Sequence, residues 1–330
     1  MTRYSRREFG RLAMAALPTA GLLARATDAF AQAKPDSVFG GVQIGVLAPF
    51  NFRSEAPDVE SILKTMVRLG SNSVEMQNDA PEAFAGAPKL PFGIPATGRG
   101  ATPEQVAALE RFSTAFSAWR ATVPMATFEE IRRMYSAAGV RIDAYRIQLS
   151  NALPDGDFDH AFRAARALGA NQVTMQMLML NGSLTTPDLV FTARVAKFAE
   201  KHQIPVGFHQ ELQPPSALWD AALAQSPQTR IQVDIGNFVA AHKDGDSPLP
   251  FIEKYHGKIV SIHLKDRKRA GAGSFVFGEG ETPVREVLQL MKRNKYTFPA
   301  FIELGYPIPE GSTRIDETAR CLAFAKAALA

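Results

Sequence analysis

The feature that most constrains the fold of this chain is a regular alternation of short apolar segments with helix-length amphipathic segments. The apolar segments are expected to form eight strands: Val42–Phe50, Asn72–Met76, Arg141–Leu149, Gln172–Met177, Pro205–His209, Ile231–Asp234, Lys258–His263 and Ala300–Glu303. Such alternation implies parallel strands joined by right-handed helical crossovers. Because eight strands of this kind close on themselves, we predict an α/β protein with a (β/α)8 TIM barrel.

Helices are expected between these strands and at the end of the chain, at Val59–Leu69, Pro103–Arg120, Phe128–Ala138, Phe158–Leu168, Pro187–His202 and Asp316–Leu329. Pro187 is expected in the first helical turn, where proline is favoured. From Asp79 to Pro124 the alternation breaks into a loop rich in Pro and Gly followed by a helical stretch. This is too long for an ordinary connection, so we predict a helical insertion, 79–124, after the second strand.

An open, doubly wound sheet is the alternative fold. The first strand-to-helix turn, Leu47-Ala-Pro-Phe-Asn-Phe, lacks the Gly-x-Gly-x-x-Gly pattern that binds dinucleotides in such sheets. The chain also has no P-loop, no Gly-x-Ser-x-Gly elbow and no His-Glu-x-x-His helix. Serine, cysteine and nucleotide chemistry therefore have little support.

The N-terminal residues are expected to form an export signal, 1–33, and not part of the barrel domain, 34–330. Ser5-Arg6-Arg7-Glu8-Phe9 has the twin-arginine pattern, an apolar run follows from Leu12 to Leu23, and Ala31-Gln32-Ala33 is a small-residue cleavage site. The apolar run is too short to span a bilayer as a mature helix. We predict a soluble periplasmic protein without stable membrane insertion; an amphipathic N-terminal helix or a retained anchor is the alternative.

Composition narrows the classes of partner. The chain has 330 residues, 46% hydrophobic and 21% charged, which is enough for one large core. The net charge of +4 comes partly from the N-terminal arginines, and no later stretch interleaves basic and aromatic residues, so nucleic acid is not an expected partner. The only cysteine, Cys321, excludes internal disulfides and Cys-ligated zinc, and is expected to be a buried structural thiol of the last helix.

Four successive predicted strands deliver a chemically useful side chain near their C-terminal ends: His209, Asp234, His263 and Glu303. Each has an ordinary alternative role, since Asp234 could cap the next turn and a lone histidine is more often a core residue. Glu303 ends an apolar strand, where an unpaired carboxylate would be costly to bury. Because the ends of parallel barrel strands meet at one face, their joint occurrence predicts a site for a divalent metal.

Four short motifs lie at or near the last strands: Asp234-Ile-Gly, His263-Leu-Lys-Asp, Gly278-Glu-Gly-Glu-Thr-Pro and Ile302-Glu-Leu. Together they resemble the sugar phosphate isomerase/epimerase family, which has a xylose isomerase-like TIM barrel. The resemblance runs from about residue 41 to the C-terminus. The twin-arginine leader and three further motifs resemble an exported branch of that family: Glu82-Ala-Phe-Ala-Gly-Ala-Pro, Trp119-Arg120 and Ala217-Leu-Trp-Asp.

The resemblance implies a divalent ion, manganese, cobalt, magnesium or zinc, and proton transfer next to a carbonyl. By position, the family's metal-binding Asp, His and Glu fall on Asp234, His263 and Glu303. The fourth position holds His209 within His-Gln-Glu, where ketose epimerases of the family have a glutamate, so either His209 or Glu211 is the fourth ligand. Gln176, at the end of the fourth strand, cannot act as a base.

The expected chemistry is formation of an enediolate from a metal-chelated sugar. Glu303 is the first candidate for the base, and Glu211 or Glu75 is the candidate acid or base on the other side. Lys265 would hold the developing oxyanion and Asp266 would orient Lys265, although a solvated ion pair is the alternative. Gln176, Trp219, Asp266 and Arg267 are candidate substrate-binding residues, with Trp219 stacking on the sugar ring.

The expected substrate is a small sugar, free, keto or glycosidically linked, because phosphorylated sugars are scarce outside the cytoplasm. Isomerisation or epimerisation is the main hypothesis, and elimination from a 3-keto-glycoside by the same site is the alternative. A barrel that binds a periplasmic sugar without turnover is a second alternative. A three-zinc nuclease is disfavoured, because only His209 and His263 lie at strand ends. The insertion is a candidate lid or dimer contact, so a homodimer is the candidate assembly.

Overall fold

The computed structural model describes residues 34–90, 101–180, 186–209, 219–242, 245–271 and 273–330. The predicted export signal, 1–33, lies outside the described residues, as does Glu211. None of the helices in the described ranges combines the length and the apolar character needed to cross a membrane.

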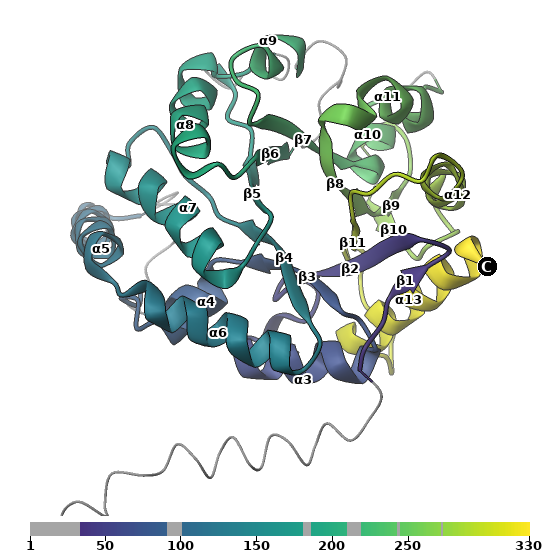
Figure 1. The fold of residues 1–330 in the computed structure, drawn as a ribbon, viewed down its shortest axis with the longest axis horizontal. Coiled ribbons are helices and arrows are strands. Elements are labelled where there is room, and N and C mark those ends of the chain that lie inside the picture. Colours follow the sequence, from purple (N-terminus) through teal and green to yellow (C-terminus); the bar gives the residue numbers. More distant parts are fainter. Residues whose placement is uncertain (1–33, 91–100, 181–185, 210–218, 243–244, 272) are drawn as a thin grey trace, which may run out of the picture. The chain divides into compact units, whose positions relative to one another are not determined.

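The predicted TIM barrel is confirmed. Parallel strands run around a closed ring in the order β2, β11, β8, β7, β6, β5, β4, β3, and β3 pairs with β2 to complete it. The helices surround these strands (Figure 1). The barrel strands are β2 (Val42–Ala48), β3 (Ser73–Gln77), β4 (Arg141–Arg146), β5 (Gln172–Gln176), β6 (Val206–His209), β7 (Thr229–Asp234), β8 (Ile259–Leu264) and β11 (Ala300–Ile302). The short strand β1 (Val38–Phe39) pairs antiparallel with β2 outside the ring.

The helices of the described residues are α3 (Val59–Leu69), α4 (Asp79–Phe84), α5 (Pro103–Thr122), α6 (Met125–Ala137), α7 (Asp155–Leu168), α8 (Leu189–His202), α9 (Trp219–Leu223), α10 (Ile235–Ala241), α11 (Pro248–Tyr255), α12 (Val284–Asn294) and α13 (Arg314–Leu329). The prediction that Pro187 opens a helix is wrong. Asp188 is the N-cap of α8, and its carboxylate accepts hydrogen bonds from the backbone N–H of Val190 and Phe191. An aspartate in this position satisfies two helix donors, so the helix begins after it.

The predicted insertion contributes α4 and α5, so three helices separate β3 from β4 where one would be expected. Helix α5 is 20 residues long, yet Arg120 is its only fully buried residue. The Arg120 guanidinium donates to Glu82 of α4 over 2.8 Å and to Asp157 of α7 over 2.8 Å, and His160 contacts the same glutamate. Removing one partner of a buried ion pair strongly destabilises a fold, because the other charge stays buried without a partner. Arg120 therefore stabilises the packing of α5 against the barrel.

The single cysteine behaves as predicted. Cys321 lies in α13 and is fully buried, next to the Tyr306 hydroxyl at 3.7 Å. Burial raises the pKa of the Cys321 thiol to about 12. A thiol with so high a pKa is protonated at neutral pH and acts as a small apolar group in the core.

Two glycines let side chains cross the narrow barrel interior. A Cβ atom on Gly45 of β2 would lie 2.6 Å from the Phe301 ring, and one on Gly207 of β6 would lie 2.6 Å from the Val260 side chain. Real Cβ atoms do not approach neighbours so closely, because a packed core has no free volume for them. The glycines therefore make room for the residues that fill the barrel below the strand ends.

We expect Gly45→Ala to lower the free energy of unfolding by about 1 to 3 kcal/mol, because the added methyl group overpacks the barrel against Phe301. Urea unfolding measures the change. Gly156→Ala is the control, because a Cβ atom at Gly156 meets nothing within 4 Å. Equal stability of Gly45→Ala and the wild type would contradict this account of the interior.

Candidate metal centre

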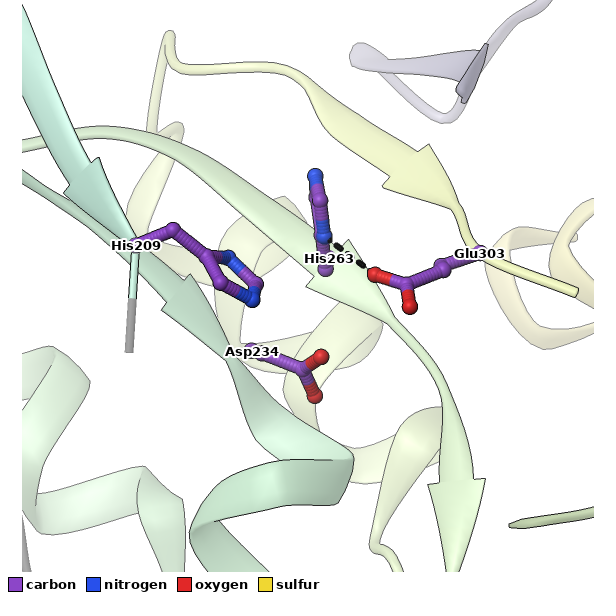
Figure 2. A group of neighbouring side chains, drawn as sticks. All are labelled: His209, Asp234, His263 and Glu303. Carbon is purple, nitrogen blue, oxygen red and sulfur yellow. Dashed lines mark hydrogen bonds and ion pairs between the residues drawn. The ribbon is translucent and has the colours of Figure 1, made fainter. Parts of the chain in front are cut away.

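Four barrel strands bring His209, Asp234, His263 and Glu303 together. His209 ends β6, Asp234 ends β7, His263 lies in β8, and Glu303 follows β11. Each offers a ligand atom, and these atoms all lie within 4.8 Å of one another; all four residues are buried. Figure 2 shows the side chains converging from neighbouring strands. The register explains the convergence, since Asp234 is the Cα partner of His263.

Asp234 has the capping role that the sequence left open, and it also lies in the cluster. Its Oδ1 accepts a hydrogen bond from the backbone N–H of Asn237 over 2.7 Å and so caps α10. Its Oδ2 accepts no hydrogen bond from the described residues, and Lys265 Nζ lies 3.6 Å from it. Burial raises the pKa of Asp234 to about 6, although Lys265 opposes the shift. One oxygen is thus used by the fold, and the other faces the cluster.

His263 lies between two carboxylates. Its Nδ1 is 2.6 Å from Glu303 Oε2, and its Nε2 is 2.6 Å from Glu75 Oε2. Burial alone would lower the pKa of His263, but the charges and hydrogen bonds of Glu75 and Glu303 outweigh it and raise the pKa to about 9. The imidazole is therefore a cation in the metal-free chain, and it must release a proton before it can bind a metal.

Glu303 also pairs with Lys265, whose Nζ lies 2.5 Å from Glu303 Oε1. Burial would raise the pKa of Glu303, but the hydrogen bond from His263 and the charge of Lys265 hold it well below its usual range. The carboxylate is thus ionised and free of a proton at neutral pH. Lys265 follows the end of β8, two residues after His263, and both cations contact the Glu303 carboxylate.

His209 is the neutral member of the cluster. Burial lowers its pKa well below the usual value, and the charges of Arg146 and His263 act in the same direction. The two imidazole rings lie 4.9 Å apart between centroids. A neutral imidazole can act as a metal ligand without first losing a proton.

Glu75 belongs to a network of hydrogen bonds that crosses the barrel interior next to His263. Its carboxylate accepts from Thr174 over 2.6 Å and from Gln232 over 3.0 and 3.1 Å, and Gln232 in turn accepts from Arg146 over 2.8 Å. Burial would raise the pKa of Glu75, but the charge and hydrogen bond of His263 lower it to about 2. Sequence reasoning placed Glu75 at a strand end but missed Gln232 and Arg146, which no local motif marks.

The donor set fits a divalent metal ion. It combines two imidazoles with two carboxylates, which suits manganese, cobalt and zinc. The Asp234 oxygen that accepts no hydrogen bond faces the other three residues, and a cation there would offset the cost of burying it. Glu75 holds the remaining nitrogen of His263, as carboxylates beside metal-binding histidines commonly do.

Two other predicted site residues, Asp266 and Trp219, have contacts outside the cluster. Asp266 does not orient Lys265; its carboxylate accepts hydrogen bonds from the backbone N–H of Gly278, Gly280 and Thr282, and so holds the loop before α12. Trp219 is fully buried at the start of α9, a helix that packs against α8 and β7. Stacking of Trp219 on a sugar therefore stays a prediction.

Gln176 and Arg267 lie closer to the cluster. Gln176 is the Cα partner of His209 across β5 and β6. Arg267 follows β8 and donates from Nη1 to Asn237 of α10 over 2.8 Å, three residues beyond Asp234. Both occupy the C-terminal ends of the strands, where a substrate would enter.

Comparisons with solved structures agree with the fold. A sugar phosphate isomerase/epimerase from Parabacteroides distasonis is 16% identical with a TM-score of 0.56, over 88% of this chain and 96% of that one. A xylose isomerase domain protein from Planctomyces limnophilus is 15% identical with a TM-score of 0.60, over 87% and 97%. The 3-keto-D-glucoside 4-epimerase from E. coli is 9% identical with a TM-score of 0.57, over 87% and 99%.

These similarities establish that the chain has the xylose isomerase-like TIM barrel fold. The chain matches no protein-family model and no curated protein. At such identities the activities of the similar proteins do not carry over by themselves.

We expect the purified protein to contain close to one divalent metal ion per chain, and the double variant Asp234→Asn, Glu303→Gln to lose it, because two of the four ligand atoms lose their charge. Elemental mass spectrometry measures both. The matched control is Asp246→Asn, Glu253→Gln, which changes two exposed carboxylates. A wild type that stays empty after incubation with manganese, cobalt or zinc would contradict the site.

We expect Glu75→Gln to weaken manganese binding roughly 10- to 100-fold, because the carboxylate that orients His263 loses its charge. A competition titration against a metal-binding dye measures the affinity. Thr174→Val is the control, since it removes a hydrogen bond to Glu75 but leaves the charge in place, and its effect should be much smaller. Equal affinities of Glu75→Gln and the wild type would rule out this role.

Proposed function

We propose that the protein is a divalent-metal-dependent sugar isomerase or epimerase that removes a proton next to the carbonyl of a non-phosphorylated or keto-sugar. The observation that carries this proposal is the buried cluster at the strand ends, in which Lys265 contacts the carboxylate of Glu303. Such a cluster combines metal ligands, a base and a cation within one site. The xylose isomerase-like fold supports the choice of sugar chemistry.

The ion would be held by His209, Asp234, His263 and Glu303. When bound, it supplies Lewis acidity that polarises a carbonyl and makes the neighbouring C–H group more acidic. His263 would be a neutral ligand and would have to give up one proton, while Glu75 would keep the ring in its orientation.

Glu303 is the candidate base. Its ionised state at neutral pH allows it to accept a proton from carbon, and its neighbours His263 and Lys265 fix its two oxygens in place. Lys265 would then stabilise the oxygen on which negative charge develops, because its ammonium group lies beside Glu303 in a largely buried site. On the opposite face of the sugar, Glu211 remains the candidate acid.

The substrate follows from the predicted export signal. If the chain acts in the periplasm, free or keto-sugars are more available than sugar phosphates. One protein of the same fold is a 3-keto-D-glucoside 4-epimerase, whose substrate has a carbonyl within the ring. The same residues would serve elimination from a 3-keto-glycoside, because Lys265 is a cation close enough to the base to protonate a leaving group.

We expect the manganese-loaded protein to exchange a carbon-bound proton of 3-keto-glucose or a related keto-sugar with deuterium from the solvent. Glu303→Gln should lower the exchange rate by at least about 100-fold, because a general base contributes 10²- to 10⁴-fold. Proton NMR in D₂O follows the exchange and separates epimerisation from elimination by the product formed.

The control for this experiment is again Asp246→Asn, Glu253→Gln, which should exchange at the wild-type rate. Because Glu303 is also a candidate ligand, the manganese content of each sample is measured in parallel. Tight binding of a sugar by the metal-free wild type, with no exchange in the loaded protein, would instead support a barrel that binds sugar without turnover.

A further inference from the structure

The side chain of Arg146 lies next to the candidate metal centre but is not part of it. It comes from the end of β4, and its Nη1 donates to Gln232 Oε1 over 2.8 Å and lies 3.7 Å from Glu75 Oε1. Glu75 in turn contacts His263, one of the four candidate ligands, over 2.6 Å. Arg146 is therefore separated from the candidate centre by a single side chain.

The other edge of the guanidinium has no hydrogen-bond partner among the residues that the structure describes. Neither Nε nor Nη2 of Arg146 donates a hydrogen bond to any of the residues that the structure describes, although the side chain is only 11% exposed. Neither nitrogen is among the fully buried atoms without a partner, so both reach solvent and a ligand can approach them. The Nε and Nη2 groups form a rigid fork that matches the two oxygens of an oxyanion.

The net charge of the candidate metal centre also favours an anionic ligand. Among the described residues, Glu75, Asp234 and Glu303 carry negative charge, and Arg146 and Lys265 carry positive charge. If both histidines bind the metal as neutral imidazoles, these five side chains have a net charge of −1. A divalent ion would change the net charge of the site to +1. Asp266 and Arg267, the next pair along the chain, cancel each other. A singly charged anion would neutralise the loaded site.

We propose that Arg146 binds an oxyanion of the substrate, so that the substrate is a sugar acid with a carboxylate and not a neutral sugar. This inference rests on the proposed function of the metal centre. Phosphate offers the same oxyanion chemistry, but a carboxylate carries the single charge that the site requires and suits a protein with a predicted export signal. Arg146 is then the residue that determines specificity, while Glu303 removes the proton and Lys265 stabilises the negative charge that develops.

Isothermal titration of the full-length, manganese-loaded protein with three probes tests the proposal: D-glucuronate, D-glucose 6-phosphate and D-glucose. We expect the wild type to bind glucuronate roughly 10- to 100-fold more tightly than glucose, as one charge-assisted contact implies. Arg146→Met should lose this preference. Arg141→Met is the matched control, because Arg141 begins the same strand at the opposite end of the barrel and pairs with Asp143; it should keep the preference.

A preference for glucose 6-phosphate that Arg146→Met abolishes would keep the Arg146 site and identify the anion as phosphate. Equal affinity of the wild type for glucuronate and glucose, or a preference that persists in Arg146→Met, overturns the proposal. Metal content, measured in the same samples, separates the two hypotheses: an empty wild type contradicts the proposed function, whereas a loaded protein without anion preference contradicts only this inference.

Arg146→Met could also disturb the metal centre through Gln232, which contacts Glu75. If the variant loses manganese, Arg146→Lys provides the second test, because it keeps a cation beside Glu75 but cannot present a planar fork. Arg146→Lys must then bind glucuronate more weakly than the wild type. Wild-type affinity in a fully loaded Arg146→Lys variant would overturn the role of the fork.

Discussion

The interaction on which the rest of the site depends is the pair of hydrogen bonds that hold His263 between Glu75 and Glu303. Each of these groups would be costly to bury alone, and together they keep one another ionised. A divalent ion held by this cluster would compete with the proton of His263, because an imidazole must be deprotonated before it can be a ligand. The contacts that stabilise the metal-free chain would therefore also determine how readily the candidate site takes up a metal.

The closed barrel explains why such a set of charges can exist in its interior. Glu75 and Gln232 come from β3 and β7, which lie on opposite sides of the ring, and they meet only because the interior is narrow. Gly45 and Gly207 leave room for the Phe301 ring and the Val260 side chain. Buried polar residues continue along the interior, since Gln232 donates to Ser261 over 3.0 Å and Ser261 donates to Gln172 over 3.4 Å. Because these groups are buried, each contact between them is stronger than it would be in water.

Local sequence was sufficient to predict the strands and the four clustered residues. His209, Asp234, His263 and Glu303 each end an apolar segment, and parallel strands present their C-terminal ends at one face. The structure places all four within one cluster. Helix boundaries were less accurate, since Pro187 and Asp188 compete as start signals and only the carboxylate of Asp188 satisfies helix donors.

Contacts across the barrel could not be predicted in this way. The hydrogen bonds from Arg146 to Gln232 and from Gln232 to Glu75 join residues that are far apart in the sequence. No sequence motif indicates which inward-facing polar side chains will contact one another. Asp266 was misjudged for a similar reason. The backbone N–H groups that occupy its carboxylate come from a loop more than ten residues later, so its neighbour Lys265 seemed the better partner.

The attachment of α5 has a thermodynamic consequence. Separation of α5 from the barrel would expose the buried ions Arg120, Glu82 and Asp157 to water, together with the half-buried ring of Trp119, which packs on His160. Hydration of polar groups lowers the heat-capacity change of such an opening, whereas hydration of apolar surface raises it. The charged contacts of α5 therefore offset part of the heat-capacity change that its aromatic rings contribute.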